Sequence, residues 1–331
     1  MRVAVTGITG QFGKALARVL EDEPAVNEVV GVARRPFDPA DEGFRKLVYR
    51  PGDVRDPDLR SSLAGADVIV HLAFVIGGSR ADQAQRRDIN VNGSRNVFAA
   101  TAEAGARKLI YASSIAAYGA HPDNPDLITE QHPTRGTPGV SYSQEKAEVE
   151  GILDLFEKEH PQVTVTRLRP CMVAGPGFED MLWEFLPDQA RRLPIFKTWF
   201  PRLFPNPIQG GRFLVQAVHE DDVAEAFRLA IVGDAPGAFN LAGEDVLGAR
   251  DLANILKARA VPVPLFGIRQ LVDVAHRIGI SKVPGDWVDL VRYPILVDTT
   301  RARTQLGWEP MFTSAGAMES TANRLFGSPN E

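Results

Sequence analysis

The fold of this 331-residue chain follows from its opening stretch, Arg2-Val3-Ala4-Val5-Thr6-Gly7-Ile8-Thr9-Gly10-Gln11-Phe12-Gly13. The apolar run that ends at Thr6 predicts a buried strand, and the amphipathic stretch Gln11–Leu20 predicts a helix. Glycines 7, 10 and 13 mark the turn and the first helical residues between them. A strand, a glycine turn and a helix in this order are typical of a dinucleotide-binding unit.

Short apolar runs and amphipathic stretches keep alternating as far as about residue 170. Several of the apolar runs lack polar alternation, as strands buried on both faces do. This pattern predicts an α/β, Rossmann-type doubly wound parallel sheet with right-handed crossovers and a smaller, mixed C-terminal substrate lobe. The expected strands are Val3–Thr6, Glu28–Ala33, Leu47–Tyr49, Asp67–Ala73, Lys108–Ser114, Val163–Leu168 and Ala238–Leu241, and the expected helices are Gln11–Leu20, Gln83–Ala104, Ser141–Glu159 and Val223–Ile231.

The domain boundaries follow from breaks in that rhythm. We expect a dinucleotide-binding domain over residues 1–176, with 214–243 packing onto it, and a substrate-binding lobe from 177–213 and 244–331. The stretch Gly175–Gly211 is rich in proline and aromatic residues and predicts a mostly apolar substrate pocket. An aromatic packing cluster or a subunit interface is the alternative for this stretch.

The composition limits the classes of partner that we expect. A net charge of −5 gives no electrostatic footprint for nucleic acid. No run of about 18 apolar residues exists, so we expect no integral membrane contact. Cys171 is the only cysteine and the N-terminus lacks a signal-peptide pattern, which fits a cytoplasmic location. The expected partner is a small-molecule substrate, with a homodimer possible.

Each residue of the glycine turn has an expected role. Gly7 makes the tight turn, Gly10 lets backbone amides approach a pyrophosphate at the helix N-terminus, and Gly13 allows close helix–strand packing. The alternative is that the glycines only turn the chain. A phosphate-cradling P-loop is excluded because Ile8 and Ala15 stand where that motif needs Gly and Ser or Thr. Residues expected at the cofactor are Gly7, Thr9, Gly10, Gln11, Phe12 and Gly13.

The end of the second expected strand indicates which dinucleotide is bound. An acidic residue there binds the ribose 2′-hydroxyl of NAD, whereas arginine accommodates the 2′-phosphate of NADP. Arg34 and Arg35 occupy this place. They favour NADP(H), with NAD(H) possible, unless both arginines are simply solvated.

A tyrosine and a lysine form the candidate catalytic pair. Tyr142 and Lys146 are spaced i,i+4 and therefore share one face of the expected helix Ser141–Glu159. A neighbouring ammonium would lower the pKa of a tyrosine, whose ordinary value is about 10. Tyr142 could then exchange a proton with a carbonyl or alcohol oxygen.

Six motifs in order carry a family resemblance. Besides the glycine turn, they are Asp53-Val54, His71-Leu72-Ala73, Asn90-Val91-Asn92-Gly93, Ser113-Ser114-Ile115-Ala116-Ala117-Tyr118-Gly119 and Tyr142-x-x-x-Lys146. The chain resembles the extended short-chain dehydrogenase/reductase family, which includes sugar-nucleotide epimerases and dehydratases. The likeness covers residues 1–177 well and the remainder loosely.

This resemblance implies a role for each matching residue. Ser114 would polarise the substrate oxygen, Tyr142 would be the acid/base, and Lys146 would also bind the nicotinamide ribose. Asp53 would contact the adenine, and Asn92 would match the family's helix asparagine near the active site. A small buried filler is the alternative for Cys171. Further residues implied at the cofactor are Val54, Leu72, Ala73, Phe74, Pro170, Cys171 and Val173.

The sequence departs from the sugar-nucleotide enzymes where they bind a diphosphate. Val215-Gln216-Ala217 stands where an Arg-Asp-aromatic run is usual, and Asp289-Leu290-Val291-Arg292 lacks the expected Gly-Asp. A buried diphosphate needs positioned guanidiniums, and only Arg212 or Arg292 could compensate. His219-Glu220-Asp221-Asp222 is interpreted as a strand end with a helix N-cap at Asp221 or Asp222, not as a metal site.

Three functions remain open at this point. The favoured one is an NADP(H)-dependent oxidoreductase that reduces a carbonyl, or oxidises an alcohol, on a mostly apolar small molecule. The first alternative is a sugar-nucleotide epimerase or dehydratase that retains its NAD(P). The second is a non-catalytic dinucleotide sensor, against which the complete Ser114/Tyr142/Lys146 set argues.

Overall fold

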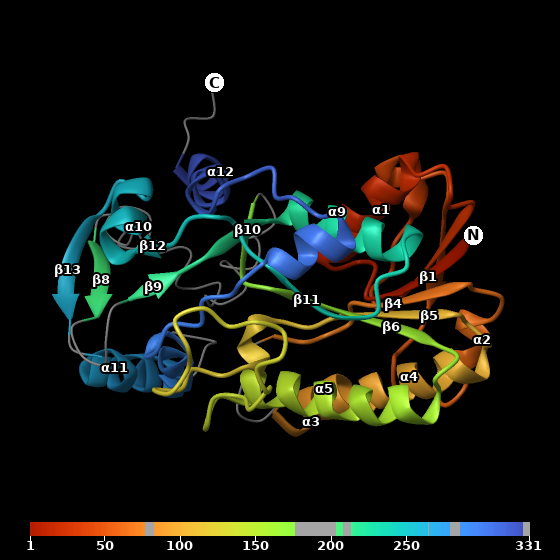
Figure 1. Ribbon diagram of the computed structural model, residues 1–331, viewed down its shortest axis with the longest axis horizontal. Coiled ribbons are helices and arrows are strands. Elements are labelled where there is room, and N and C mark those ends of the chain that lie inside the picture. Colours follow the sequence, from red (N-terminus) through yellow and green to blue (C-terminus); the bar gives the residue numbers. More distant parts are fainter. Residues whose placement is uncertain (77–82, 176–202, 208–212, 264, 279–284, 327–331) are drawn as a thin grey trace.

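The computed structural model describes residues 1–76, 83–175, 203–207, 213–263, 265–278 and 285–326. Its centre is a parallel sheet in the order β11-β6-β5-β4-β1-β2-β3, shown in Figure 1. The chain order reverses between β1 and β4, and ligands of open α/β sheets bind at the carboxyl ends of such strands. The strands are β1 (Arg2–Thr6), β2 (Glu28–Ala33), β3 (Leu47–Pro51), β4 (Val68–His71), β5 (Lys108–Ala112), β6 (Thr164–Pro170) and β11 (Gly237–Leu241).

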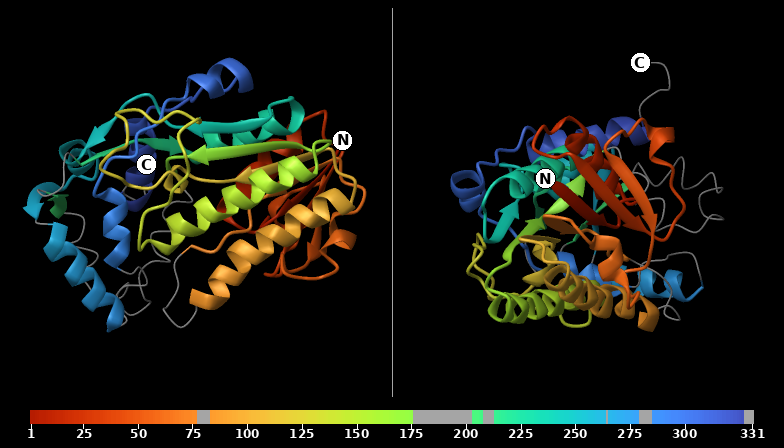
Figure 2. Two further views of the ribbon diagram at one scale, coloured as in Figure 1. Left: turned by 60° about the horizontal axis from the view of Figure 1, so that its bottom comes forward. Right: turned by 90° about the vertical axis from the view of Figure 1, so that its right-hand side faces the viewer.

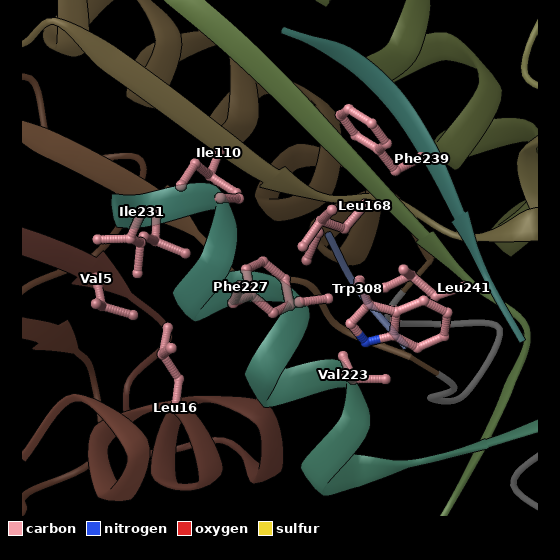
Figure 3. Packing of buried hydrophobic residues seen from close by; sticks show 14 of the residues in the cluster. Val5, Leu16, Ile110, Leu168, Val223, Phe227, Ile231, Phe239, Leu241 and Trp308 are labelled. Carbon is pink, nitrogen blue, oxygen red and sulfur yellow. The ribbon is translucent and has the colours of Figure 1, made fainter. Parts of the chain in front are cut away.

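Helices cover both faces of this sheet, as Figures 1 and 2 show. One face carries α1 (Gln11–Asp22) and α9 (Glu220–Val232), and the other carries α2 (Leu59–Leu63), α4 (Gly93–Glu103) and α5 (Ser141–Glu159). Figure 3 shows the hydrophobic core between the sheet and the α1/α9 face, in which Phe227 of α9 packs beside Leu168 of the sheet and Trp308. All three side chains are buried, so this face holds the C-terminal segment against the sheet.

A smaller set of elements gathers at the end of the molecule opposite the N-terminus (Figure 1). It contains short two-stranded pairs and helices, as expected for a mixed lobe. Most of Gly175–Gly211 lies outside the described residues, including its aromatic residues apart from Phe204 in β8. The elements of the lobe and its connections are β7 (Met172–Ala174), β8 (Leu203–Pro207), β9 (Leu214–Val215), β10 (Ala217–His219), β12 (Leu247–Gly248), β13 (Arg259–Val263), α10 (Ala249–Ile255), α11 (Leu265–Arg277), the 3-10 helix Gly285–Val291 and α12 (Ser314–Phe326).

The structure confirms the expected fold class and nearly all its elements. The predicted helix Gln83–Ala104 is divided, because α3 (Gln83–Arg87) and α4 are joined by a π-helical turn over Asp88–Asn92. The predicted N-cap of α9 is wrong. His219 caps this helix by accepting from the Asp221 backbone N–H, while the Asp222 carboxylate accepts from the Met311 and Phe312 amides. Among the described helices, none combines the length and apolar character needed to span a bilayer.

Candidate active site

The loops that follow β1 and β4 meet at the reversal of the sheet. Gly7 has a φ of +81°, which favours glycine, and its N–H donates to Val32 O over 2.8 Å. A Cβ on Gly7 would lie 2.7 Å from the backbone nitrogen of Ala73. Gly7 and the Leu72-Ala73 segment therefore lie together, as the sequence predicted for a cofactor crevice.

The N-terminus of α1 has the features of an anion site. Gly10 precedes the helix without a side-chain cap, and the first turn carries no acidic residue. Its amides can therefore face a phosphate at the positive end of the helix dipole. Gln11 and Phe12 are partly buried in this turn, and the Gln11 Nε2 donates to Glu220 over 2.6 Å. The predicted glycine cradle is thus shaped for a dinucleotide.

Substitution of Gly13 tests the close packing of the glycine turn directly. A Cβ on Gly13 would lie 2.3 Å from the Ile8 carbonyl oxygen, a backbone atom that has no room to move. We expect Gly13→Ala to lower the free energy of unfolding by about 1–3 kcal/mol and to weaken cofactor binding. Gly151→Ala in α5 is the control, because nothing lies within 4 Å of its Cβ position. Denaturant unfolding curves that show equal stability for both variants would contradict the close packing.

A row of side chains runs from the glycine turn to the catalytic lysine. Thr6, His71 and Tyr111 are register neighbours on β1, β4 and β5. His71 Nδ1 lies 2.7 Å from Thr6 Oγ1, and its ring stacks on Tyr111 at 5.7 Å. Burial lowers the pKa of His71 to about 3, so this histidine is neutral and structural. The row ends where Lys146 Nζ donates to the Tyr111 hydroxyl over 3.3 Å.

Ser114 and Tyr142 come together as predicted. Tyr142 lies in the first turn of α5, and a side-chain hydrogen bond joins it to Ser114. Ser114 also caps the 3-10 helix Ile115–Ala117 by accepting from the Ala116 N–H over 3.2 Å. The neighbouring Ser113 instead donates to the buried carboxylate of Glu150 over 2.5 Å, so its hydroxyl is already engaged.

Lys146 is buried and fully surrounded. Its Nζ donates to Ala112 O over 2.7 Å and lies 3.7 Å from the centre of the Phe74 ring. Burial lowers the pKa of Lys146 to about 7, although the nearby carboxylates of Glu150 and Glu145 act in the opposite direction. The Lys146 charge therefore depends on two carboxylates of its own helix.

The predicted lowering of the Tyr142 pKa is wrong for the structure described. Burial raises the pKa of Tyr142, and only the hydrogen bond from Ser114 acts to lower it. The physical reason is desolvation, which disfavours the phenolate and also reduces the charge on Lys146 itself. In this arrangement Tyr142 is a proton donor at neutral pH.

The pKa of Lys146 predicts how cofactor affinity depends on pH. The side chain is an ammonium below about pH 7 and a neutral amine above it. We expect binding of NADP(H) to weaken as the pH rises from 6 to 8.5, because the cationic donor is lost. The Lys146→Met variant corrects for titration of the cofactor phosphate. Fluorescence titrations in which wild type and Lys146→Met change in parallel would refute this dependence.

The structure does not bring Asn92 to the active site. Its side chain is exposed and donates to the Asp88 carboxylate over 2.8 Å. Asn90 is the inward residue, fully buried, with its Nδ2 donating to Glu145 over 2.7 Å and to Val75 O over 2.9 Å. Asn90 and Asn92 are two residues apart in the helical turn Asp88–Asn92, so they point to different sides and only Asn90 faces the core.

Asp53 and Val54, which the resemblance implies at the cofactor, follow β3. Asp53 is held by Arg55 through contacts of 2.8 and 3.0 Å, and these hydrogen bonds lower the pKa of its carboxyl. Arg55 also reaches Asp88 at 3.2 Å, a contact that sequence reasoning missed. Val54 is buried beside Gly93.

The two arginines after β2 have different surroundings. Both side chains are exposed. Arg35 Nη2 donates to Thr9 O over 3.1 Å, and the charge of Arg34 acts on Asp53. Arg35 therefore lies at the glycine turn, whereas Arg34 acts on Asp53 after β3.

The residues at the end of β6 and after it are those that the resemblance implies at the cofactor. Pro170 ends β6, Val173 is partly buried in β7, and the Cys171 N–H donates to Leu241 O over 2.9 Å. The Cys171 side chain is buried in the core, and burial raises the pKa of its thiol. This environment fits the predicted inert filler.

A known family matches most of the chain. The model of the NAD dependent epimerase/dehydratase family covers residues 3–242. The chain belongs to this family. The predicted resemblance to extended short-chain dehydrogenases/reductases is therefore confirmed, which makes the chain an enzyme of that type.

Two relatives illustrate the sequence likeness. An uncharacterized protein of Mycobacterium tuberculosis (strain ATCC 25618 / H37Rv) is 25% identical over 324 residues, which cover 96% of this chain and 82% of the relative. The N-acetyl-alpha-D-glucosaminyl-diphospho-ditrans,octacis-undecaprenol 4-epimerase of Escherichia coli O157:H7 is 34% identical over 134 residues, 40% of this chain and 39% of that protein.

Solved structures share the fold across the whole chain. The UDP-glucose 4-epimerase of Thermotoga maritima, solved with UDP-glucose, has a TM-score of 0.72 at 21% identity and covers 98% of both chains. The dTDP-glucose 4,6-dehydratase DesIV of Streptomyces venezuelae, solved with NAD and TYD, has a TM-score of 0.70 at 22% identity and covers 98% of this chain and 96% of its own. At these identities the likeness shows a common fold.

Proposed function

We propose that the protein is an NADP(H)-dependent oxidoreductase that reduces a carbonyl, or oxidises an alcohol, on a mostly apolar small molecule. The observation that carries this proposal is the hydrogen bond between Ser114 and Tyr142, one helical turn before the buried Lys146 of the same helix. Lys146 and the two hydroxyls are the groups that proton transfer to an oxygen requires. An intact set of this kind also argues against a non-catalytic sensor.

The chain's own residues would hold the substrate oxygen and move one proton. When bound, the nicotinamide supplies a hydride to the carbonyl carbon or accepts one from the alcohol carbon. Ser114 donates a hydrogen bond that polarises the carbonyl, and the Tyr142 hydroxyl gives its proton to that oxygen. Lys146 stabilises the resulting phenolate by its positive charge. In the alcohol-oxidising direction, Tyr142 takes the proton back.

The preference for NADP(H) rests on Arg34 and Arg35. Both guanidiniums are exposed, with Arg35 donating to Thr9 O and the charge of Arg34 acting on Asp53. A ribose 2′-phosphate beside them would gain charge-assisted hydrogen bonds. We expect Arg34→Ala to raise the Kd for NADPH about tenfold or more and the Kd for NADH less than threefold. Arg107→Ala is the control, because Arg107 lies just before β5, at the amino ends of the strands, and pairs with Asp67. A wild type that binds NADH more tightly than NADPH would refute the preference.

An apolar substrate is supported by what stands in place of a diphosphate site. Val215 occupies the position of the usual arginine and offers no charge, and Gln216 beside it is buried. Its Oε1 accepts from the Val297 N–H over 2.8 Å, and its Nε2 donates to Val297 O over 3.3 Å. Both polar ends of Gln216 therefore hold the backbone of the C-terminal segment and are already used.

A sugar-nucleotide epimerase or dehydratase is the second candidate. The family match and the 34% identity to the undecaprenol-diphospho-sugar 4-epimerase favour it. Such an enzyme would oxidise and re-reduce one substrate with its cofactor retained, so cofactor would not be consumed.

Consumption of cofactor separates these two candidates. The purified protein is incubated with NADPH or NADH and a panel of aromatic and aliphatic aldehydes and ketones, and in parallel with UDP-glucose. We expect NADPH loss with at least one carbonyl and no change of UDP-glucose. Interconversion of UDP-glucose and UDP-galactose without net cofactor loss would overturn the oxidoreductase proposal.

A further inference from the structure

The C-terminal lobe reaches the catalytic tyrosine through one aromatic residue. Trp287, in the 3-10 helix Gly285–Val291, stacks on the Tyr142 ring at 5.4 Å with an interplanar angle of 25°. Phe74 meets the same ring edge-on at 5.8 Å. Tyr142 is thus flanked by one aromatic residue from the loop after β4 and another from the lobe.

Contacts between the 3-10 helix Gly285–Val291 and α11 hold Trp287 in place. The Gly285 N–H donates to Asp273 of α11 over 3.0 Å, and Arg269 of α11 contacts Asp289 at 2.5 Å. A Cβ on Gly285 would lie 2.5 Å from the Arg269 carbonyl oxygen, so the two segments pack closely. Contacts on either side of Trp287 therefore fix its backbone against α11.

The position of the stack brings Trp287 beside any reacting group. Trp287 and Tyr142 are both only partly buried, so their rings are not sealed inside the core. A carbonyl oxygen bonded to the Tyr142 hydroxyl places the groups on its carbon beside the Tyr142 ring and its neighbours.

We propose that Trp287 is a specificity-determining residue that selects substrates whose reacting carbonyl or alcohol carbon carries a planar apolar group. Aromatic rings favour offset stacking with other planar rings over contact with saturated rings of equal size. Phe74 supplies a second aromatic surface beside the Tyr142 ring. This inference rests on the proposed oxidoreductase function and names the substrate class for the same site.

Two aldehydes of matched size test it. We would measure kcat/KM with NADPH for benzaldehyde and cyclohexanecarbaldehyde in wild type, Trp287→Leu and Trp287→Phe. The ratio of the two values is expected to fall about fivefold in Trp287→Leu and to stay within twofold of wild type in Trp287→Phe. NADPH affinity is expected to be unchanged in both variants. An equal loss for both aldehydes would show a purely structural role and overturn the proposal.

A binding measurement separates this inference from the proposed function. If wild type reduces no carbonyl, the oxidoreductase proposal fails, and Trp287 is still tested with benzyl alcohol and cyclohexylmethanol. Ligand-observed NMR titrations of the NADP-loaded protein are expected to show tighter binding of benzyl alcohol, and about fivefold weaker binding of it to Trp287→Leu. Equal affinity of wild type for the two alcohols would overturn the role of Trp287.

Discussion

Tyr142→Phe is expected to lower kcat/KM about a thousandfold while cofactor binding stays within twofold of wild type. The substitution removes only the hydroxyl that donates the proton, and general acid catalysis contributes about 10²–10⁴ in rate. The ring contacts with Phe74 at 5.8 Å and with Trp287 at 5.4 Å do not involve that hydroxyl, so the fold is retained. Steady-state kinetics and a fluorescence titration with NADPH measure the two effects separately.

Ser114→Ala is the partner experiment. Ser114 polarises the substrate oxygen but gives up no proton, so we expect a smaller loss, about a hundredfold. Retention of more than a tenth of wild-type activity in Tyr142→Phe would show that another group supplies the proton.

Glu150→Gln is expected to lower the free energy of unfolding by about 3–5 kcal/mol, the usual effect of removing one partner of a buried ion pair. The Glu150 carboxylate is buried and accepts two hydrogen bonds of 2.8 Å from Arg169, while Arg167 lies 3.3 Å away. Burial alone would raise the pKa of Glu150, but the hydrogen bonds and charge of Arg169 hold it below its ordinary value. Loss of the Glu150 charge leaves the buried guanidiniums of Arg169 and Arg167 without the carboxylate that they share.

The same helix offers a matched control. Glu148 pairs with Arg87 at 2.7 Å, but both side chains are exposed. Glu148→Gln should therefore cost about 0–1 kcal/mol. Denaturant unfolding that shows similar losses for both variants would contradict the role assigned to Glu150. Because Glu150 also sustains the charge on Lys146, its variant should lose activity as well.

Local pattern predicted most of the fold. The bounds of β2 (Glu28–Ala33) and α5 (Ser141–Glu159) agree with the sequence expectation, because their apolar periodicity and flanking turns are complete within each segment. The i,i+4 spacing also placed Tyr142 and Lys146 on one helix face. Ser114 met them because β5 and α5 are consecutive elements of one crossover.

What the sequence could not show depends on long-range contacts. Trp287 meets Tyr142 only through the packing of the 3-10 helix near α5, and no local pattern encodes that contact. Asn90 rather than Asn92 faces the core, and the spacing of the two residues does not show which of them is buried. The direction of the Tyr142 pKa shift follows from burial, which spacing does not measure. The domain boundaries remain predictions.

Transfer of deuterium from cofactor to product tests most directly whether the protein is an oxidoreductase that consumes NADPH. The protein would be incubated with a carbonyl that it consumes and NADPH deuterated at the transferable position of the nicotinamide, and the product analysed by mass spectrometry. If the protein is an oxidoreductase, we expect one deuterium in the product for each NADPH consumed. Turnover of substrate with NADPH unchanged and no deuterium in the released product would contradict it.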